Sequence, residues 1–293
     1  RILACETEEE IYRLLGMDTP PPELRIGADE MEAAARHVLP RLLPYGSVKG
    51  DLQTQTSWTD GTASIEEMSV EAKRLGLAYL AITDHTKSLA FIGGLDDKGV
   101  AKQAKEIDRL NDAHVSKRAR ILKGSEVDIR EDGTLDLTDK TLASLDWVGI
   151  SVHSHFTMTE KSMTARLVKA MSNPNVDCLF HPTGRLIGRR EPYALDMQEI
   201  IATAKKYRVA LEINAYPDRS DLKDLHVRMA VEAHVPLVIN TDAHAPAHFA
   251  FLPLGEAIAR RGWATKRDII NAKSLKDLHA WLEKKRKRPS WTS

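Results

Sequence analysis

Two hydrophobic patterns alternate along the chain from residue 48 onward, and this alternation constrains the fold more than any other feature of the sequence. Seven short runs of β-type residues, apolar at their centres, are separated by amphipathic patterns at helical spacing. The β-type runs span residues 48–56, 78–85, 119–129, 146–154, 177–182, 209–215 and 236–244. The helical patterns span residues 64–76, 100–118, 161–173, 196–208 and 221–234.

This order of elements predicts an α/β fold with a parallel sheet. Strands that alternate with helices pair in parallel through right-handed crossovers. Apolar strand centres indicate that both faces of the sheet are covered. Seven strands within about 200 residues favour a closed or nearly closed TIM-like (β/α)7 barrel. A doubly wound open sheet is the structural alternative.

The bulk composition is that of a soluble globular protein. The chain has 293 residues, of which 42% are hydrophobic, and a formal net charge of zero. No apolar run approaches the roughly 18 residues that span a bilayer, so we expect no membrane partner. Cys5 and Cys178 make no disulfide framework, which favours a reduced cytoplasmic location, with Cys178 as core filler. The first residues lack the layout of a signal peptide. An initial Arg indicates a processed or trimmed fragment.

Residues 1–46 differ from the rest of the chain. A capped helix is predicted within "ETEEEIYRLLG" (6–16), followed by the extended connector "DTPPPELRIG" (18–27) and a second helix over about 29–43. This stretch is too small to be a domain, so we interpret it as the end of a preceding region and a linker. The main domain then spans residues 47–293. It ends in the basic run "EKKRKR" (283–288), which is expected to be a solvated tail rather than a phosphate contact.

Polar residues stand at the carboxyl ends of nearly all the predicted strands. In a parallel barrel these ends open onto one face, where active sites are built. A single histidine or aspartate there is readily explained as a hydrogen-bonded structural residue. Structural needs give no reason for the placement to recur on strand after strand. The residues are Gln53, Gln55, Asp84, His85, Glu126, His153, His181, Glu212, Asn214, Asp242 and His244.

These residue types predict a catalytic metal centre. Imidazole with carboxylate and no cysteine suits Zn²⁺, Mn²⁺ or Fe²⁺ in a catalytic site. The ligands are too many for one ion, so two or three are expected, an arrangement typical of phosphoester hydrolysis. Arg185, Arg189 and Arg190 follow His181 and are candidates for holding phosphate. Surface ion pairing is an equally good explanation for Arg189 and a weaker one for Arg185.

Seven ordered motifs resemble the PHP (polymerase and histidinol phosphatase) domain, in the version found at the C-terminus of bacterial X-family DNA polymerases. The resemblance covers about residues 46–281. The motifs are "GDLQTQTSWTDG", "ITDH", "KGSEVDI", "SVHSHF", "FHPTGRLIGRREPY", "ALEINAYPDRSDL" and "INTDAH". Residues 7–25 also resemble the segment that joins the polymerase portion to this domain. The palm carboxylates of the polymerase are absent, so this chain alone should not polymerise DNA.

The resemblance implies a distorted seven-stranded barrel with a trinuclear metal centre. The implied activity is Mn²⁺-dependent 3′→5′ exonuclease on DNA, with 3′-phosphatase or abasic-site cleavage as further candidates. Its partners would be DNA and the polymerase portion of the same natural chain. Glu126, His181 and Asp242 would be the catalytic residues. Carried over by position, one ion would be held by Glu126, His153 and His181, and another by Asp60, His85 and His244.

The implied first metal site departs from the family pattern. Gln53 and Gln55 stand where the family has two histidines, which leaves Glu126 and Asp242 as charged ligands. An amide offers a metal only a neutral carbonyl oxygen, much poorer than imidazole. We therefore expect a weak or empty first site, in a centre that binds Mn²⁺ or Zn²⁺.

Further roles are proposed for residues around this face. Arg185, Arg190 and Asn214 are candidate substrate contacts, and Trp58 or Tyr216 is a candidate for stacking a base. Asp84 is expected to orient His85. His155 is a candidate spare ligand, and His248 is expected to have a capping or core role. Two functions remain open beside the nuclease: a catalytically weakened barrel that stabilises the polymerase part or helps bind DNA, and a phosphatase of small phosphate monoesters.

Overall fold

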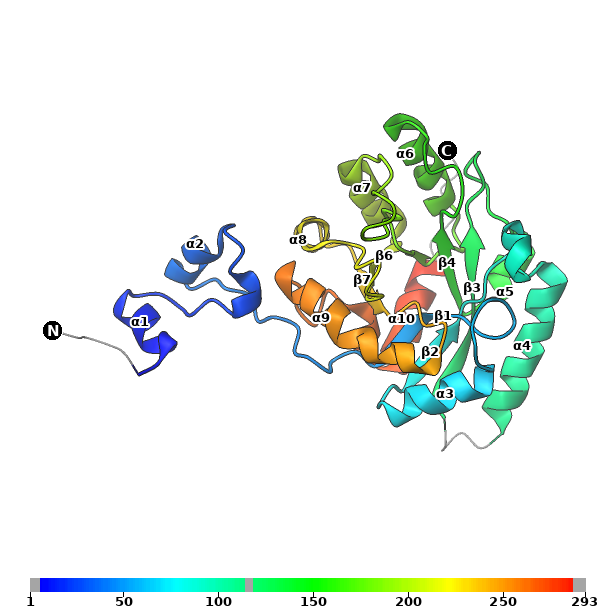
Figure 1. Cartoon of the computed structure of the whole chain (residues 1–293), viewed down its shortest axis with the longest axis horizontal. Coiled ribbons are helices and arrows are strands. Elements are labelled where there is room, and N and C mark those ends of the chain that lie inside the picture. The colour runs from blue at the N-terminus through cyan, green and yellow to red at the C-terminus, as the bar shows by residue number, and fades with distance from the viewer. Residues whose placement is uncertain (1–5, 114–117, 287–293) are drawn as a thin grey trace.

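The computed structural model describes residues 6–113 and 118–286, and its centre is a parallel sheet of seven strands in sequential order (Figure 1). Each neighbouring pair is parallel. The strands are β1 (Gly50–Thr54), β2 (Tyr79–Ile82), β3 (Arg120–Asp128), β4 (Trp147–Ser151), β5 (Cys178–Leu179), β6 (Ala210–Asn214) and β7 (Leu237–Asn240). A doubly wound sheet would reverse its strand order part-way, so the sequential order confirms the barrel.

The barrel closes between β1 and β7 through an irregular seam. Backbone pairing there is limited to an isolated bridge between Thr54 and Ala243. Side chains supply further bonds. Leu52 N donates to Asn240 Oδ1 at 2.9 Å, and buried Asn271 donates to the carbonyl oxygens of Gly50 and Ile239 at 2.8 and 2.6 Å. The predicted distortion of the barrel is located at this seam.

Helices surround the strands and account for the predicted amphipathic patterns. They are α3 (Ile65–Arg74), α4 (Asp97–Asp112), α5 (Asp139–Ser144), α6 (Glu160–Met171), α7 (Met197–Tyr207), α8 (Asp224–Glu232), α9 (Leu252–Arg261) and α10 (Leu275–Arg286). Short 3-10 turns are η2 (Lys87–Ile92), η4 (Pro246–Phe251) and η5 (Ile270–Ala272). The five predicted helical patterns correspond to α3, α4, α6, α7 and α8, whereas α5, α9 and α10 were not predicted. Among the described residues, every helix is too short or too polar to cross a lipid bilayer.

The barrel interior changes from apolar to polar along the strands. One cluster of buried residues joins strand residues such as Tyr79, Leu122 and Trp147 to Leu278 and Leu282 of α10. Cys178 lies in the same cluster, which confirms its predicted role as core filler. Side chains two residues apart on a strand point to the same face. The interior positions therefore run from this apolar layer to polar groups at the carboxyl ends, where the predicted site lies.

The N-terminal segment lies to one side of the barrel (Figure 1). It contains α1 (Glu8–Leu14), η1 (Pro22–Leu24) and α2 (Glu30–Ala35). Leu24 is fully buried, and Glu23 pairs with Arg260 of α9 at 2.7 Å. The second predicted helix was too long. It ends at Ala35, two residues before His37 adopts a left-handed φ of 56°.

The expectation of a wholly solvated basic tail was wrong for its described part. Lys285 is buried and its Nζ lies 3.2 Å from Asp177 Oδ1, while Arg286 reaches the other oxygen of Asp177. The run instead helps fix α10 to the barrel. Lys287 and Arg288, like Cys5, lie outside the described residues.

Candidate metal centre

The centre is organised around Glu126, a buried residue of β3 whose two carboxylate oxygens face different groups. Oε1 lies 2.8 Å from His181 Nε2 and 3.3 Å from His153 Nε2. Oε2 accepts from the side-chain amides of Gln53 and Gln55 at 3.0 and 2.7 Å. Burial alone would raise the pKa of Glu126. The nearby His85 and the hydrogen bonds with His153 and His181 outweigh it and hold the pKa well below its ordinary value.

A second group lies beside it, at the turn that follows β1. Possible ligand atoms of Asp60, His85 and His244 all lie within 4.8 Å of one another. Asp60 Oδ2 is 3.7 Å from His85 Nε2 and 3.5 Å from His244 Nε2. The same distance limit also holds for His85, Glu126 and His153, so His85 stands between the two groups. Tertiary folding therefore brings together residues from the ends of β1, β2, β3, β4 and β7.

Two of the histidines are oriented by partners outside the centre. His153 Nδ1 lies 3.1 Å from Asp128 Oδ1, and His244 Nδ1 donates to the Asp242 carbonyl oxygen at 2.7 Å. In each case the outer nitrogen is engaged and Nε2 faces the centre, as metal-ligating histidines require. Asp128 was missed by the sequence analysis, although it lies two residues after Glu126 in the motif "GSEVDI" and therefore on the same face of the strand.

The charge state of the histidines follows from these partners. Burial would lower the pKa of His153, but Asp128 and Glu126 outweigh it and raise the pKa to about 9. Asp60 and Asp242 likewise raise the pKa of His244 to about 9, against the effect of burial. His181 differs, because burial and the charge of Arg219 lower its pKa to about 4.

These residues fit divalent metal ions. Imidazole and carboxylate groups converge, His85 Nδ1 is buried with no hydrogen-bond partner, and the Nε2 atoms of His153 and His244 face inward. Bound ions would supply the electrophilic charge and water activation that phosphoester hydrolysis needs.

The first predicted metal site is different, because its amides do not offer oxygen to an ion. A carboxylate only accepts hydrogen bonds, so Gln53 and Gln55 must turn their N–H groups toward Glu126. Their oxygens are engaged elsewhere. Gln55 Oε1 accepts from Thr83 Oγ1, and Gln53 Oε1 accepts from Asn214 Nδ2, both at 3.2 Å. The expectation that these glutamines are weak metal ligands does not agree with this geometry.

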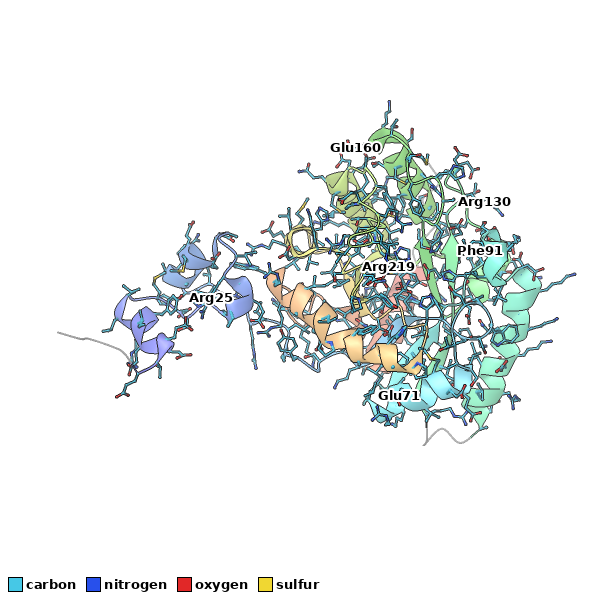
Figure 2. All side chains as sticks on the ribbon, viewed as in Figure 1. Arg25, Glu71, Phe91, Arg130, Glu160 and Arg219 are labelled. Carbon is cyan, nitrogen blue, oxygen red and sulfur yellow. The ribbon has the colours of Figure 1, made fainter. Side chains whose placement is uncertain are left out.

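Arg219 is a site residue that the sequence analysis missed. It lies on the loop between β6 and α8, and its Nε donates to Asp242 Oδ2 at 3.0 Å. Figure 2 labels it near the centre of the barrel. The signal was present in "NAYPDRSDL", where an arginine follows by five residues the end of a strand that carries buried polar side chains. Burial would raise the pKa of Asp242, but Arg219 and His244 outweigh it and lower the pKa.

The three predicted substrate contacts are used within the protein. Arg185 donates to the backbone oxygens of Arg219 and Ser220. Arg190 donates to Gly184 O, and its guanidinium lies 3.9 Å from the centre of the Phe156 ring. The remaining residue, Asn214, is fully buried, and its amide nitrogen is shared among Gln53, Glu212 and Asp242. It therefore presents no open surface to a substrate. Arg189 is exposed beside Asp218, as its salt-bridge interpretation predicts.

Asp84 does not orient His85, contrary to expectation. It accepts from Thr56 N, Thr59 Oγ1 and Gln103 Nε2 at 2.8, 2.6 and 2.7 Å. These bonds tie the turn that carries Asp60 to β2 and α4. Asp84 therefore positions Asp60 through the backbone of the turn.

The remaining candidates lie at the margin of the centre. His155 is half exposed and lies 3.8 Å from Glu131, and it belongs to neither ligand group found among the described residues. His248 Nδ1 accepts from His244 N at 3.2 Å, which agrees with a capping role. Tyr216 packs edge-on against His248, and Trp58 donates to Glu106 at 3.1 Å. Both aromatic rings therefore have partners within the protein.

Comparison with known proteins identifies the family. The family described as "PHP domain" matches residues 51–216. This chain belongs to the PHP domain family. The family expected from the seven motifs is thus confirmed.

This PHP chain resembles two kinds of curated protein. It is 43% identical over 278 residues to "DNA polymerase/3'-5' exonuclease PolX" of Bacillus subtilis (strain 168), which covers 95% of this chain and 48% of that protein. It is 30% identical over 155 residues to a "Probable phosphatase" of Caldicellulosiruptor saccharolyticus, with 52% of this chain and 59% of that protein covered. The chain spans about half the length of these curated relatives.

A solved structure supports the fold. The histidinol phosphate phosphatase of Lactococcus lactis, determined with zinc, L-histidinol and phosphate, aligns with a TM-score of 0.55 at 16% sequence identity. The alignment covers 73% of this PHP chain and 93% of the other. At this identity the likeness shows the barrel fold alone, and function has to be argued from the site.

Proposed function

We propose that this PHP domain is a metal-dependent 3′→5′ exonuclease that hydrolyses phosphodiester bonds of DNA. The observation that carries the proposal is the convergence of buried histidines and carboxylates on Glu126 at the carboxyl face of the barrel. The 43% identity to a protein named as a polymerase and 3'-5' exonuclease favours DNA as the substrate. Removal of a 3′-phosphate or cleavage at an abasic site would use the same phosphoester chemistry. Mn²⁺ or Zn²⁺ suits the ligand set.

The site residues divide into ion-holding and proton-handling groups. We propose that Glu126, His153 and His181 hold one ion, and that Asp60, His85 and His244 hold another. His181 is uncharged at neutral pH because its pKa is about 4. Its single proton lies on Nε2, which donates to Glu126, so Nε2 would bind an ion with no net loss of a proton once that proton moves to Nδ1. Asp242 stays ionised. Arg219 and Asn214 hold its Oδ2, which leaves Oδ1 as the oxygen that accepts a proton from an attacking water.

The test is Mn²⁺-dependent release of nucleotides from 3′-hydroxyl single-stranded and gapped DNA. Parallel substrates carrying a 3′-phosphate or an abasic site define the bond that is cut. His181→Ala should abolish release, whereas His155→Ala, which alters a half-exposed histidine outside both ligand groups, should leave it unchanged. Equal activity in the wild type and His181→Ala would identify a contaminating nuclease and overturn the proposal.

A second function is favoured by the two glutamines. Their hydrogen bonds to Glu126 deprive the centre of two imidazoles, as in a barrel that has lost turnover and stabilises a polymerase part or helps hold DNA. A barrel of this kind would bind DNA but would not hydrolyse it with any divalent metal ion. The third candidate, a phosphatase of small monoesters, would instead turn over histidinol phosphate in a substrate panel.

We further propose that residues 1–46 end a preceding polymerase region and that residues 47–293 form the PHP domain. Support comes from the B. subtilis relative, of which this chain matches 48%. No residue of α1 is buried, and Ile11, Leu14 and the next residue, Leu15, are exposed. A separately expressed polymerase half should co-purify with residues 1–293 better than with residues 47–293. Equal recovery would contradict this assignment.

Buried Cys178 agrees with a reducing cytoplasmic compartment.

A further inference from the structure

The position of the first family metal is already surrounded by hydrogen-bond donors of the protein. Glu126 Oε2 accepts from the amides of Gln53 and Gln55. Across the position, Asp242 Oδ2 accepts from Arg219 Nε at 3.0 Å and from Asn214 Nδ2 at 3.2 Å. An ion there would have to displace these donors before it reached either carboxylate. The residues present therefore do not fit a metal at this position.

A protein cation also supplies positive charge at this position. The Arg219 side chain is only 16% exposed, so its charge is weakly screened by solvent. The guanidinium is part of the chain and keeps its charge at any working pH. The occupancy of a metal site, in contrast, depends on the concentration of the ion.

The loop that carries Arg219 is fixed to the barrel before any ligand arrives. Arg185 holds the backbone oxygens of Arg219 and Ser220. Thr183 N donates to Asp221 Oδ2 at 2.9 Å, and Asp221 forms a bridge with Asn214 at the end of β6. Ordering this loop therefore costs little when substrate binds. Arg185, expected to hold phosphate directly, is a positioning residue for Arg219.

The Arg219 guanidinium has hydrogen-bonding capacity that the protein does not use. Its Nη1 is buried and has no hydrogen-bond partner. A buried, unpaired donor on a charged group is costly, and guanidinium pairs strongly with phosphate oxygens. Nη1 belongs to a guanidinium that already borders the ligand cluster, where a phosphoester would lie.

We propose that in this chain Arg219 and the Gln53–Gln55 pair replace the first metal ion, leaving a two-ion centre in which Arg219 binds the phosphate of the substrate. The phosphate contact rests on the phosphoesterase function proposed above. The ion count does not, because it follows from the donor geometry alone.

The ion count is tested by loading the full chain with Mn²⁺ or Zn²⁺ and measuring metal per chain by mass spectrometry. The wild type should bind two ions. The double variant Gln53→His, Gln55→His should bind one more, since it exchanges two amide donors for imidazole ligands. Three ions in the wild type, or an unchanged count in the double variant, would overturn the proposal that these residues replace the first ion.

The phosphate contact is tested with inorganic phosphate as the probe, by the shift in melting temperature that it causes in the metal-loaded chain. Arg219→Gln should bind two ions but phosphate at least about 10-fold more weakly. Arg219→Lys should recover part of this affinity. Arg189→Gln, which alters an exposed arginine on a nearby loop, should match the wild type. Unchanged phosphate affinity in a folded Arg219→Gln chain would refute the contact.

These readouts separate the inference from the proposed nuclease activity. Two ions and Arg219-dependent phosphate binding without DNA cleavage would refute the nuclease and leave the inference standing. DNA cleavage together with phosphate binding that does not depend on Arg219 would support the nuclease and refute the phosphate contact.

Discussion

The two sides of the Glu126 carboxylate face different kinds of neighbour. On the Oε1 side, His153 and His181 present nitrogens that can hold either a proton or a metal. On the Oε2 side, Gln53 and Gln55 present N–H groups that only donate. The same carboxylate is thus prepared for an ion on one side and saturated by hydrogen bonds on the other. The comparison teaches that a carboxylate at the position of a metal ligand can take an ion where its neighbours can give up a proton, as imidazole can, and not where they are amide donors.

Replacing Glu126 removes both sides at once and should have the largest effect. Glu126→Gln removes the negative charge that His153 and His181 share. It also replaces the carboxylate that accepts from Gln53 and Gln55 by a third amide. We expect metal content to fall from two ions to about one per chain, because Asp60, His85 and His244 still form a ligand group, and any nuclease rate to drop more than about 100-fold. Metal analysis and a DNA digestion assay measure these outcomes. Retention of the wild-type metal content would show that Glu126 is not the organising ligand.

The pH dependence of metal affinity sharpens the comparison next. In the metal-free chain His153 and His244 have pKa values of about 9, so each ion must displace a proton. Affinity for Zn²⁺ or Mn²⁺ should therefore rise about 10-fold per pH unit for each proton released, or roughly 100-fold from pH 6 to pH 8. Isothermal titration in buffers of different ionisation enthalpy would count the protons. A flat profile over this range would contradict the prediction.

The same two histidines predict an opposite trend for stability without metal. Their folded pKa values lie above the ordinary value of 6.5. The stability they contribute is fully present below about pH 6.5 and is lost as the pH rises through about 9. Melting temperatures of the chelator-treated chain should reveal this loss, and bound metal should remove it.

Replacing Asp128, the partner of His153 Nδ1, should have a smaller effect on metal binding, confined to the Oε1 side of Glu126. Asp128→Asn weakens the hold on His153 Nδ1 and should lower metal affinity by about 10- to 100-fold. Asp132→Asn, in the exposed turn that follows the same strand, is the matched control and should bind metal as the wild type does. If both variants behave alike, Asp128 has no orienting role.

The smallest effect is expected from a change on the closed side. Thr83→Val removes the donor to Gln55 Oε1 and the acceptor of Thr54 N. It leaves these buried groups unpaired, at a cost of about 1–3 kcal/mol each in the free energy of unfolding. The number of bound ions should stay the same. Urea denaturation and metal analysis test both parts. Altered metal content would mean that the glutamine side takes part in metal binding.

Much of the architecture could be predicted because it depends on local periodicity. The alternation of strand and helix patterns indicated parallel pairing, and residues such as His85 and His244 were placed at the correct face from their positions at strand ends. Helix ends were less predictable. The second helix stops at Ala35, five residues before Pro40. The chain turns just after the helix, where the backbone of His37 adopts a left-handed conformation.

The least predictable features depend on contacts between distant parts of the chain. Lys285 belongs to a basic run that looks solvated, yet it is buried against Asp177, which is 108 residues away. Arg185 follows a ligand strand and has the chemistry of a phosphate clamp, yet a neighbouring loop takes up its donors. Charge and spacing alone do not reveal such partners.

The sequence by itself determined that seven parallel strands would bring metal-ligand side chains to one face, because strand periodicity and the position of a residue at a strand end are local properties. Only the tertiary structure decided what Gln53 and Gln55 do there. Their amides must face a carboxylate more than 70 residues away, and that carboxylate accepts N–H and repels oxygen. The same holds for Arg219, whose place beside Asp242 follows from loop contacts across the barrel mouth.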